Sequence, residues 1–169
     1  MIPAVVLLGA VTAERLAELW LARCNTADLL AKGAREFAPS HYPAIVLLHT
    51  FWLAGLWLFG WMHPLSSFWL MIFLVLQALR VWILMTIGHR WTTRIIVLPD
   101  APLVTNGPYR FLSHPNYFVV IGEIAALPLC VGLPWFALIF SASNAIVLPV
   151  RVRAENAALI GLRCRSQFN

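Results

Sequence analysis

The chain has 169 residues, of which 61% are hydrophobic and 11% are charged. Because soluble globular domains usually contain about 25% charged residues, this composition excludes an ordinary soluble fold and indicates a single integral membrane domain. We interpret the net charge of +5 as a consequence of membrane topology and not as a sign of nucleic-acid binding, because of the distribution of basic residues described below.

The predicted fold is all-α, with about five transmembrane helices in one domain. A bilayer core requires roughly 20 apolar residues per helix, and three separate runs approach this length. A longer fourth run is interrupted by Pro128, Gly132 and Pro134, which favours a tight turn between two antiparallel helices. The predicted helices are residues 2–21, 44–62, 67–87, 117–131 and 135–150.

The first helix contains three charged residues, Glu14, Arg15 and Glu18. They stand where the apolar core of a signal peptide would end, so we expect a retained helix and not a cleaved signal. Glu14 and Glu18 are one helical turn apart, and Arg15 is within reach of an ion pair with Glu18. Two interpretations are open: a neutralised ion pair near the cytoplasmic interface, or the polar wall of a pocket in which Glu14 and Glu18 contact a substrate.

The second helix begins near His41 and Tyr42 and carries His49 about two turns further along. Tyrosine is common at a membrane interface, and a single histidine within a span most often forms a hydrogen bond between helices. His41 and His49 are also candidates for contact with a substrate. No carboxylate stands at ligand spacing from them, so we predict no metal site.

The third and fourth helices each contain one interior charge, Arg80 and Glu123 respectively. Ionisable residues within a membrane span are costly and usually pair with one another. We therefore predict a structural salt bridge between Arg80 and Glu123.

Motifs of several other protein classes are missing from the sequence. The three cysteines, Cys24, Cys130 and Cys164, form no CxxC pair, which argues against a disulfide framework or a zinc site. The glycines form neither a GxGxxG motif nor a Walker loop, so we predict no Rossmann or P-loop nucleotide site.

The basic residues indicate the orientation of the helices in the membrane. Ten of the 12 lie between the first and second helices, between the third and fourth, or after the fifth. The connections around residues 63–66 and 128–134 contain none. By the positive-inside rule, the N-terminus is predicted outside and the C-terminus in the cytoplasm of a multi-pass cytoplasmic-membrane protein.

Residues 88–113, "GHRWTTRIIVLPDAPLVTNGPYRFLS", form a segment too long for a tight turn, on the predicted cytoplasmic side. It leads into "HPNY", and "RVRAEN" arrives on the same side from the fifth helix. His114 near the cap and Pro115 as first helical residue are ordinary helix-start chemistry. That chemistry does not explain the convergence with Arg151 and Glu155, which lie one helical turn apart on one face.

These residues resemble the isoprenylcysteine carboxyl methyltransferase family of integral membrane enzymes. The family pattern reads here as "LVTNGPYR" at 103–110, "SHPNY" at 113–117 and "RVRAE" at 151–155. Ser113 stands where the family usually has arginine, and Asn156 where a second glutamate is common. The N-terminal half, with "ERLAELWLARCN", "HYP" and "RWTTRIIVLP", looks similar to a bacterial branch encoded alongside type III polyketide synthases, whose members O-methylate phenolic or pyrone lipids.

The resemblance implies S-adenosylmethionine as cofactor, with Glu155 binding its amino group and Arg151 facing the methyl acceptor. A phenolic acceptor, with a pKa near 10, would in addition need a base, for which His41 and His49 are the candidates. By position, the resemblance implies a cofactor site formed by Arg94, Ala101, Pro102, Leu103, Val104, Tyr109, His114, Pro115, Asn116, Tyr117 and Glu155.

The expected function is S-adenosylmethionine-dependent methyl transfer to a lipophilic acceptor from the bilayer, as O-methylation of a polyketide-derived phenol or pyrone. Carboxyl methylation of a thioether-linked prenyl acid is an alternative within the family. A membrane NADPH-dependent reductase of related architecture is an alternative from another enzyme class. A membrane subunit whose polar residues only pack helices is the non-catalytic alternative.

Overall fold

The structure of the chain, a computed structural model, describes residues 2–99, 101–102 and 104–166, and the side chains of all of these except 41 and 160–166. The described residues form five α-helices: α1 (Ile2–Ala31), α2 (Tyr42–Phe59), α3 (Ser67–Ile87), α4 (Pro115–Cys130) and α5 (Pro134–Ser166). Three 3₁₀ turns, η1 (Pro39–His41), η2 (Gly88–Arg90) and η3 (Gly107–Arg110), and two short strands lie between them. The all-α prediction is confirmed.

Two helices extend well beyond the predicted apolar spans. α1 continues past residue 21 to Ala31, and α5 continues past residue 150 to Ser166. Polar residues end the apolar run that can lie in a bilayer core, but a helix continues through them unless a helix-breaking residue such as proline or glycine follows. At the α4–α5 connection, Pro128 lies inside α4, and the turn is formed at Val131–Leu133 with Gly132 at a φ of +69°.

Three helical segments are long and apolar enough to cross a membrane: Tyr42–Phe59, Ser67–Arg90 and Pro134–Leu159. α4 is apolar but shorter, with 16 residues. α1 has the length, but Glu14, Arg15 and Glu18 interrupt its apolar stretch. The structure therefore supports three of the five predicted spans by length and composition.

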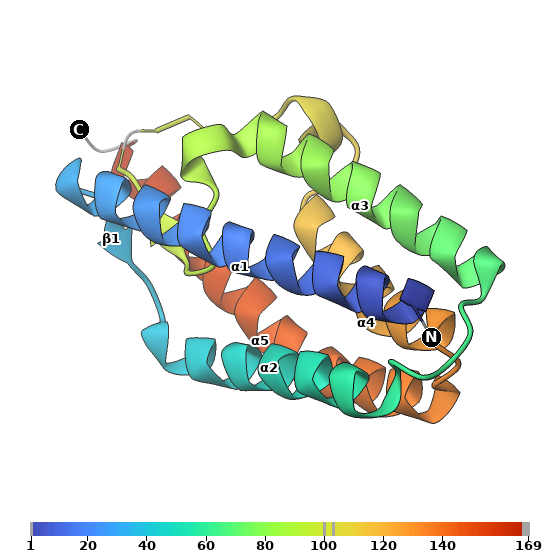
Figure 1. Cartoon of the computed structure of the whole chain (residues 1–169). Helices are drawn as coiled ribbons and strands as arrows, with labels where there is room; N and C mark the ends of the chain where they lie inside the picture. The colour runs from blue at the N-terminus through green and yellow to red at the C-terminus, as the bar shows by residue number, and fades with distance from the viewer. Residues whose placement is uncertain (1, 100, 103, 167–169) are drawn as a thin grey trace.

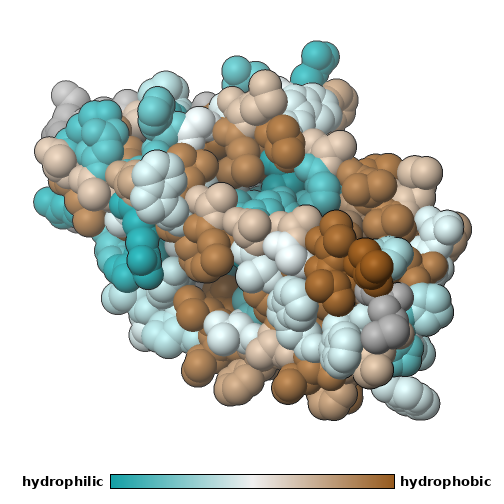
Figure 2. Space-filling view, viewed as in Figure 1, coloured by the Kyte–Doolittle hydropathy of each residue, from teal (hydrophilic) through white to brown (hydrophobic). Residues whose placement is uncertain are grey.

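α4 lies at the centre of the bundle, packed against both α3 and α5, and α2 packs against α5 (Figure 1). The interior is a cluster of apolar side chains that includes Leu8, Trp52, Leu56, Phe73, Ile83, Val119, Ile124 and Leu127. The outer surface also carries many exposed large apolar side chains, among them Trp20, Phe51, Met71, Trp135 and Ile146. An apolar face of the kind visible in Figure 2 would be unfavourable in water and suits contact with lipid tails.

The C-terminal end of α1, strand β1 (Arg35–Glu36) and the end of α5 gather at one end of the bundle (Figure 1). β1 pairs antiparallel with β2 (Ile96–Val97), with Arg35 opposite Val97. The buried Asn25 of α1 donates from Nδ2 to the Trp91 carbonyl at 2.9 Å. These contacts anchor the long connection after α3 against α1, and so position the residues that line the site.

Candidate functional site

Four buried or half-buried charged side chains form a continuous network between α1, α3 and α4, here called the charge network. Its members are Arg15, Glu18, Arg80 and Glu123. Arg80 donates from Nε to Glu123 at 2.8 Å and from Nη1 to Glu18 at 3.2 Å, and Nη2 makes a further bond to Glu123. Arg15 donates to Glu18 at 2.7 Å and to Glu123 at 3.0 Å. The predicted Arg80–Glu123 salt bridge is confirmed, and each guanidinium bridges both carboxylates.

Glu14 stands at the edge of this network, where its carboxylate lies 3.9 Å from Arg15 Nη2. Its carboxylate accepts a hydrogen bond from Gln77 Nε2 of α3 at 2.8 Å, and its side chain is 31% exposed. Figure 2 shows a hydrophilic patch between α1 and α3 with apolar side chains beside it. The predicted ion pair between Arg15 and Glu18 is observed, and both side chains also line a cavity, whereas contact of Glu14 and Glu18 with a substrate stays a prediction.

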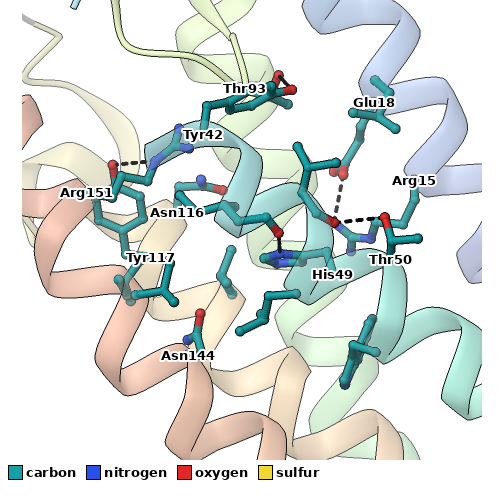
Figure 3. Close-up of a pocket in the computed structure, with 18 of the residues that line it drawn as sticks. Arg15, Glu18, Tyr42, His49, Thr50, Thr93, Asn116, Tyr117, Asn144 and Arg151 are labelled. Atoms are coloured by element: carbon teal, nitrogen blue, oxygen red, sulfur yellow. Dashed lines mark hydrogen bonds and ion pairs between the residues drawn. The ribbon is translucent and has the colours of Figure 1, made fainter. Parts of the chain in front are cut away.

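The larger cavity, called the apolar cavity, has a volume of about 220 Å³ and is enclosed mainly by α1, α2, α4 and α5. Aliphatic side chains such as Leu48, Leu53 and Val147 make up much of its wall. Its polar lining includes Glu18, His49 and Asn144, whose side chains surround one space in Figure 3. Such a lining suits a largely apolar ligand with one or a few polar groups.

The smaller cavity, called the polar cavity, has a volume of about 140 Å³ and lies beside the connection after α3. Its charged or polar lining comprises Arg90, Arg94, Tyr109, His114 and Glu155, together with the residues of the shared wall described next. Burial and the nearby Glu155 carboxylate both raise the pKa of the Tyr109 phenol above its usual value, so the hydroxyl stays protonated at neutral pH.

The two cavities adjoin along a shared wall, because five residues line both: Trp91, Thr92, Asn116, Tyr117 and Arg151. Two polar atoms in this wall, Trp91 Nε1 and Asn116 Oδ1, are buried and have no hydrogen-bond partner among the described residues. Buried polar atoms are nearly always paired, so two unpaired atoms in one wall, a donor and an acceptor, distinguish this wall from the charge network.

Tyr117 connects the residues that the sequence places one turn apart on α5. Its hydroxyl donates to Glu155 and accepts from Arg151 Nε at 3.1 Å. The His114 ring stacks on the Tyr117 ring with centroids 5.3 Å apart, and His114 Nε2 lies 3.1 Å from Asn156 Oδ1. The predicted convergence of the start of α4 with Arg151 and Glu155 is therefore observed.

The structure brings together some of the predicted cofactor residues and leaves others apart. Arg94, Tyr109, His114 and Glu155 line the polar cavity only, and Asn116, Tyr117 and Arg151 line both cavities. Ala101, Pro102, Val104 and Pro115 line neither, although the Pro102 carbonyl accepts a 2.5 Å bond from Arg90. Leu103 lies outside the described residues.

The predicted substrate residues divide in the same way. Glu18 and His49 line the apolar cavity, Glu14 lines neither cavity, and the side chain of His41 lies outside the described residues. Sequence reasoning missed Arg90, Trp91, Thr92 and Asn144, which line one or both cavities. Trp91 was missed because a tryptophan near a span end has the ordinary explanation of an interfacial anchor. The sequence feature that could have identified Trp91 as a site residue is its position in the polar connection after α3.

Fold and site together define a helical membrane-type protein in which an apolar cavity and a polar cavity share a wall. Residues 69–161, more than half of the chain, match the family model for isoprenylcysteine carboxyl methyltransferase (ICMT). The chain belongs to the ICMT family.

Two relatives are similar over most of their length. The uncharacterized protein YpbQ of Bacillus subtilis is 40% identical over 159 residues, which cover 90% of this chain and 94% of YpbQ. An uncharacterized protein of Haemophilus influenzae is 24% identical over 137 residues, covering 78% of this chain and 80% of that protein. No solved structure matches the chain.

Proposed function

We propose that the protein is an S-adenosylmethionine-dependent methyltransferase that acts on a lipophilic acceptor. The observation that carries the proposal is the wall shared by a polar and an apolar cavity. Methyl transfer requires donor and acceptor to be held in contact and in line, and a wall common to both sites provides that proximity. Membership of the ICMT family supports the same reaction class.

The residues of the polar cavity fit the proposed cofactor. Glu155 offers a carboxylate for an ammonium group, and Arg90 or Arg94 offers a guanidinium for a carboxylate. The aromatic face of Tyr109 favours a nearby cation such as a sulfonium. When bound, S-adenosylmethionine supplies a methyl group carried on positively charged sulfur.

Apolar side chains complete the cofactor fit, since Ile95, Val97 and Leu159 line the same cavity and suit the faces of an adenine ring. The unpaired Trp91 Nε1 and Asn116 Oδ1 add one donor and one acceptor at the side nearest the acceptor. This chain thus presents partners for the ammonium, carboxylate, sulfonium and adenine groups of the cofactor. The chemistry of the site supports S-adenosylmethionine better than a larger dinucleotide.

The acceptor is proposed to be a polyketide-derived phenolic lipid or alkylpyrone, methylated on oxygen. Support comes from the aliphatic lining of the apolar cavity and from Arg151 at the shared wall, where a guanidinium can stabilise an oxygen that becomes negative. Because the same guanidinium would also bind a carboxylate, carboxyl methylation of a prenylcysteine-like acid is the second candidate.

The cofactor proposal is tested by calorimetry on the detergent-purified protein, titrated separately with S-adenosylhomocysteine and NADPH. Binding of S-adenosylhomocysteine alone is expected. Binding of NADPH alone would point to a membrane reductase. Binding of neither ligand would favour a non-catalytic membrane subunit.

The proposed orientation places the N-terminus outside and the connection after α3 in the cytoplasm, where a soluble cofactor reaches the polar cavity. The support is the concentration of basic residues in that connection and in α5 after residue 150. A reporter fused to the C-terminal end should be active in the cytoplasm. Activity only on the outer side would overturn this orientation.

A further inference from the structure

His49 on α2 presents an unused basic nitrogen to the apolar cavity (Figure 3). Its Nδ1 lies 2.9 Å from the Ile45 carbonyl oxygen, one turn earlier in the same helix. A carbonyl can only accept, so Nδ1 carries the proton of that bond, and Nε2 of the neutral ring holds a lone pair. Nε2 has no hydrogen-bond partner among the residues that the structure describes.

The other titratable side chains that line this cavity already have partners. Arg15, Glu18 and Arg80 bond within the charge network. The Tyr42 hydroxyl is 3.0 Å from Thr93 Oγ1, and the Tyr117 hydroxyl bonds to Glu155 and Arg151.

Further groups in the lining, among them the unpaired Trp91 Nε1 and Asn116 Oδ1, keep hydrogen-bonding capacity but are not bases. Asn144 is an amide, and Arg151 has only donors. The imidazole of His49 is therefore the basic group in the described lining whose lone pair has no partner, whereas the Glu18 carboxylate already accepts hydrogen bonds from two guanidinium groups.

We propose that His49 accepts the proton of the acceptor's hydroxyl group, which makes it a catalytic residue and identifies the acceptor as a weakly acidic phenol or enol. This inference rests on the proposed methyltransferase function. In the step, the acceptor O–H bond breaks, an N–H bond forms at His49 Nε2, and the electron pair stays on the acceptor oxygen. The oxygen gains the methyl group as the carbon–sulfur bond of the cofactor breaks, and the proton later passes from His49 to water.

A hydroxyl acceptor explains the lone pair better than a carboxylic acid does. A carboxylic acid, with a pKa of about 4, is already ionised at neutral pH and needs no base. A phenol has a pKa of about 10 and an imidazole about 6.5, so the transfer is uphill in water. Arg151 lines the same cavity and can stabilise the oxyanion, and an acidic enol such as a hydroxypyrone reduces the gap further.

The test compares wild type with His49→Gln, which keeps a polar side chain but has no basic nitrogen. The matched control is His63→Gln, because His63 is exposed and lines neither cavity. The probe is a nitrophenol bearing a long alkyl tail, whose absorption distinguishes phenolate from phenol. At a pH about one unit below the pKa of the free probe, the probe bound to wild type or H63Q should show phenolate, and the probe bound to H49Q should show phenol.

Turnover gives the second measurement. With an alkyl phenol that lacks the nitro group as acceptor, kcat of H49Q should fall about 100-fold with KM nearly unchanged, which is the size of effect expected from losing a general base. Affinity for S-adenosylhomocysteine should agree within about two-fold among the three proteins, since His49 does not line the polar cavity.

Equal phenolate absorption in wild type and H49Q would overturn the role of His49, as would equal kcat. Faster turnover of an alkyl carboxylic acid than of the phenol, independent of His49, would overturn the acceptor class. A wild-type protein that binds no S-adenosylhomocysteine would instead refute the proposed function. If H49Q does not fold, judged by its melting temperature, His49→Asn replaces it in the same comparison.

Discussion

The charge network and the shared wall both place polar groups inside a largely apolar bundle, but they differ in whether every one of those groups has a partner. In the network, each guanidinium bridges two carboxylates. In the wall, Trp91 Nε1 and Asn116 Oδ1 have none among the described residues. A saturated network holds α1, α3 and α4 together, because separating its members would leave buried charges uncompensated. An unsaturated wall contributes less to folding and is available to a ligand.

The largest effect is expected from Arg80→Met, which leaves Glu18 and Glu123 with only Arg15 as a cationic partner. Removing one member of a buried ion pair typically costs about 3–5 kcal/mol. A strongly lowered melting temperature in detergent is expected. The control is Lys32→Met, which breaks the ion pair between Lys32 and Asp28. Because these two side chains are 58% and 47% exposed, the loss should cost less than about 1 kcal/mol. Equal melting temperatures for the two variants would show that the charge network stabilises the fold no more than an exposed ion pair does.

Glu155→Gln tests the ligand-binding region beside the shared wall, because it should alter ligand binding without disturbing the charge network. The glutamine keeps the shape but loses a charge-assisted hydrogen bond to the cofactor's ammonium, worth about 1.5–3 kcal/mol. At about 1.4 kcal/mol per decade, affinity for S-adenosylhomocysteine should fall about 10- to 150-fold in calorimetry. The melting temperature without ligand should change little, as in the exposed control Asp28→Asn. Unchanged affinity with a large loss of stability would make Glu155 structural.

Arg151→Ala should separate acceptor chemistry from cofactor binding, since Arg151 lines both cavities. Loss of a guanidinium that stabilises the acceptor oxygen should lower turnover about 10- to 100-fold, consistent with about 1.5–3 kcal/mol for a charged hydrogen bond. Affinity for S-adenosylhomocysteine should change by less than about three-fold. The exposed Arg153→Ala is the control. A larger loss in cofactor affinity than in turnover would place Arg151 in the cofactor site instead.

The smallest effect is expected from Asn25→Ala, which removes a hydrogen bond that holds the backbone of Trp91 in the shared wall. The alanine leaves the Trp91 carbonyl without its 2.9 Å donor, at a cost of about 1 kcal/mol. The melting temperature should fall by less than in the Arg80 variant, and the affinity for S-adenosylhomocysteine by less than in Glu155→Gln. An affinity loss as large as that of Glu155→Gln would show that Asn25 controls the position of the wall.

Much of the fold followed from local pattern. The apolar runs predicted where α2, α3, α4 and the start of α5 lie, because burial of apolar residues in lipid depends mainly on their number and continuity. Arg80 and Glu123 could be paired from sequence because an isolated charge within a span requires a partner. The extension of α1 to Ala31 was missed, since polar residues end an apolar run but not a helix.

The candidate site was predictable only in part. Arg151 and Glu155 were expected to meet the start of α4 because they lie one turn apart on the same side of the membrane, and Tyr117 contacts both. The strip around Pro102 was expected in the cofactor site, but Ala101, Pro102 and Val104 line neither cavity, because irregular backbone does not place side chains with a fixed period. No spacing rule pointed to Trp91, whose position depends on its contact with Asn25.

The sequence by itself determined the membrane character, the number of helices, the Arg80–Glu123 pair and the family. Each follows from composition, periodicity or a local motif, which the chain carries before it folds. Only the tertiary structure decided that two cavities share a wall and that Trp91 Nε1 and Asn116 Oδ1 are left unpaired in it. It also decided that the His49 lone pair faces the apolar space. These features depend on distances between helices that are remote in sequence, and no local pattern encodes which hydrogen-bonding groups remain unsatisfied once those helices have packed.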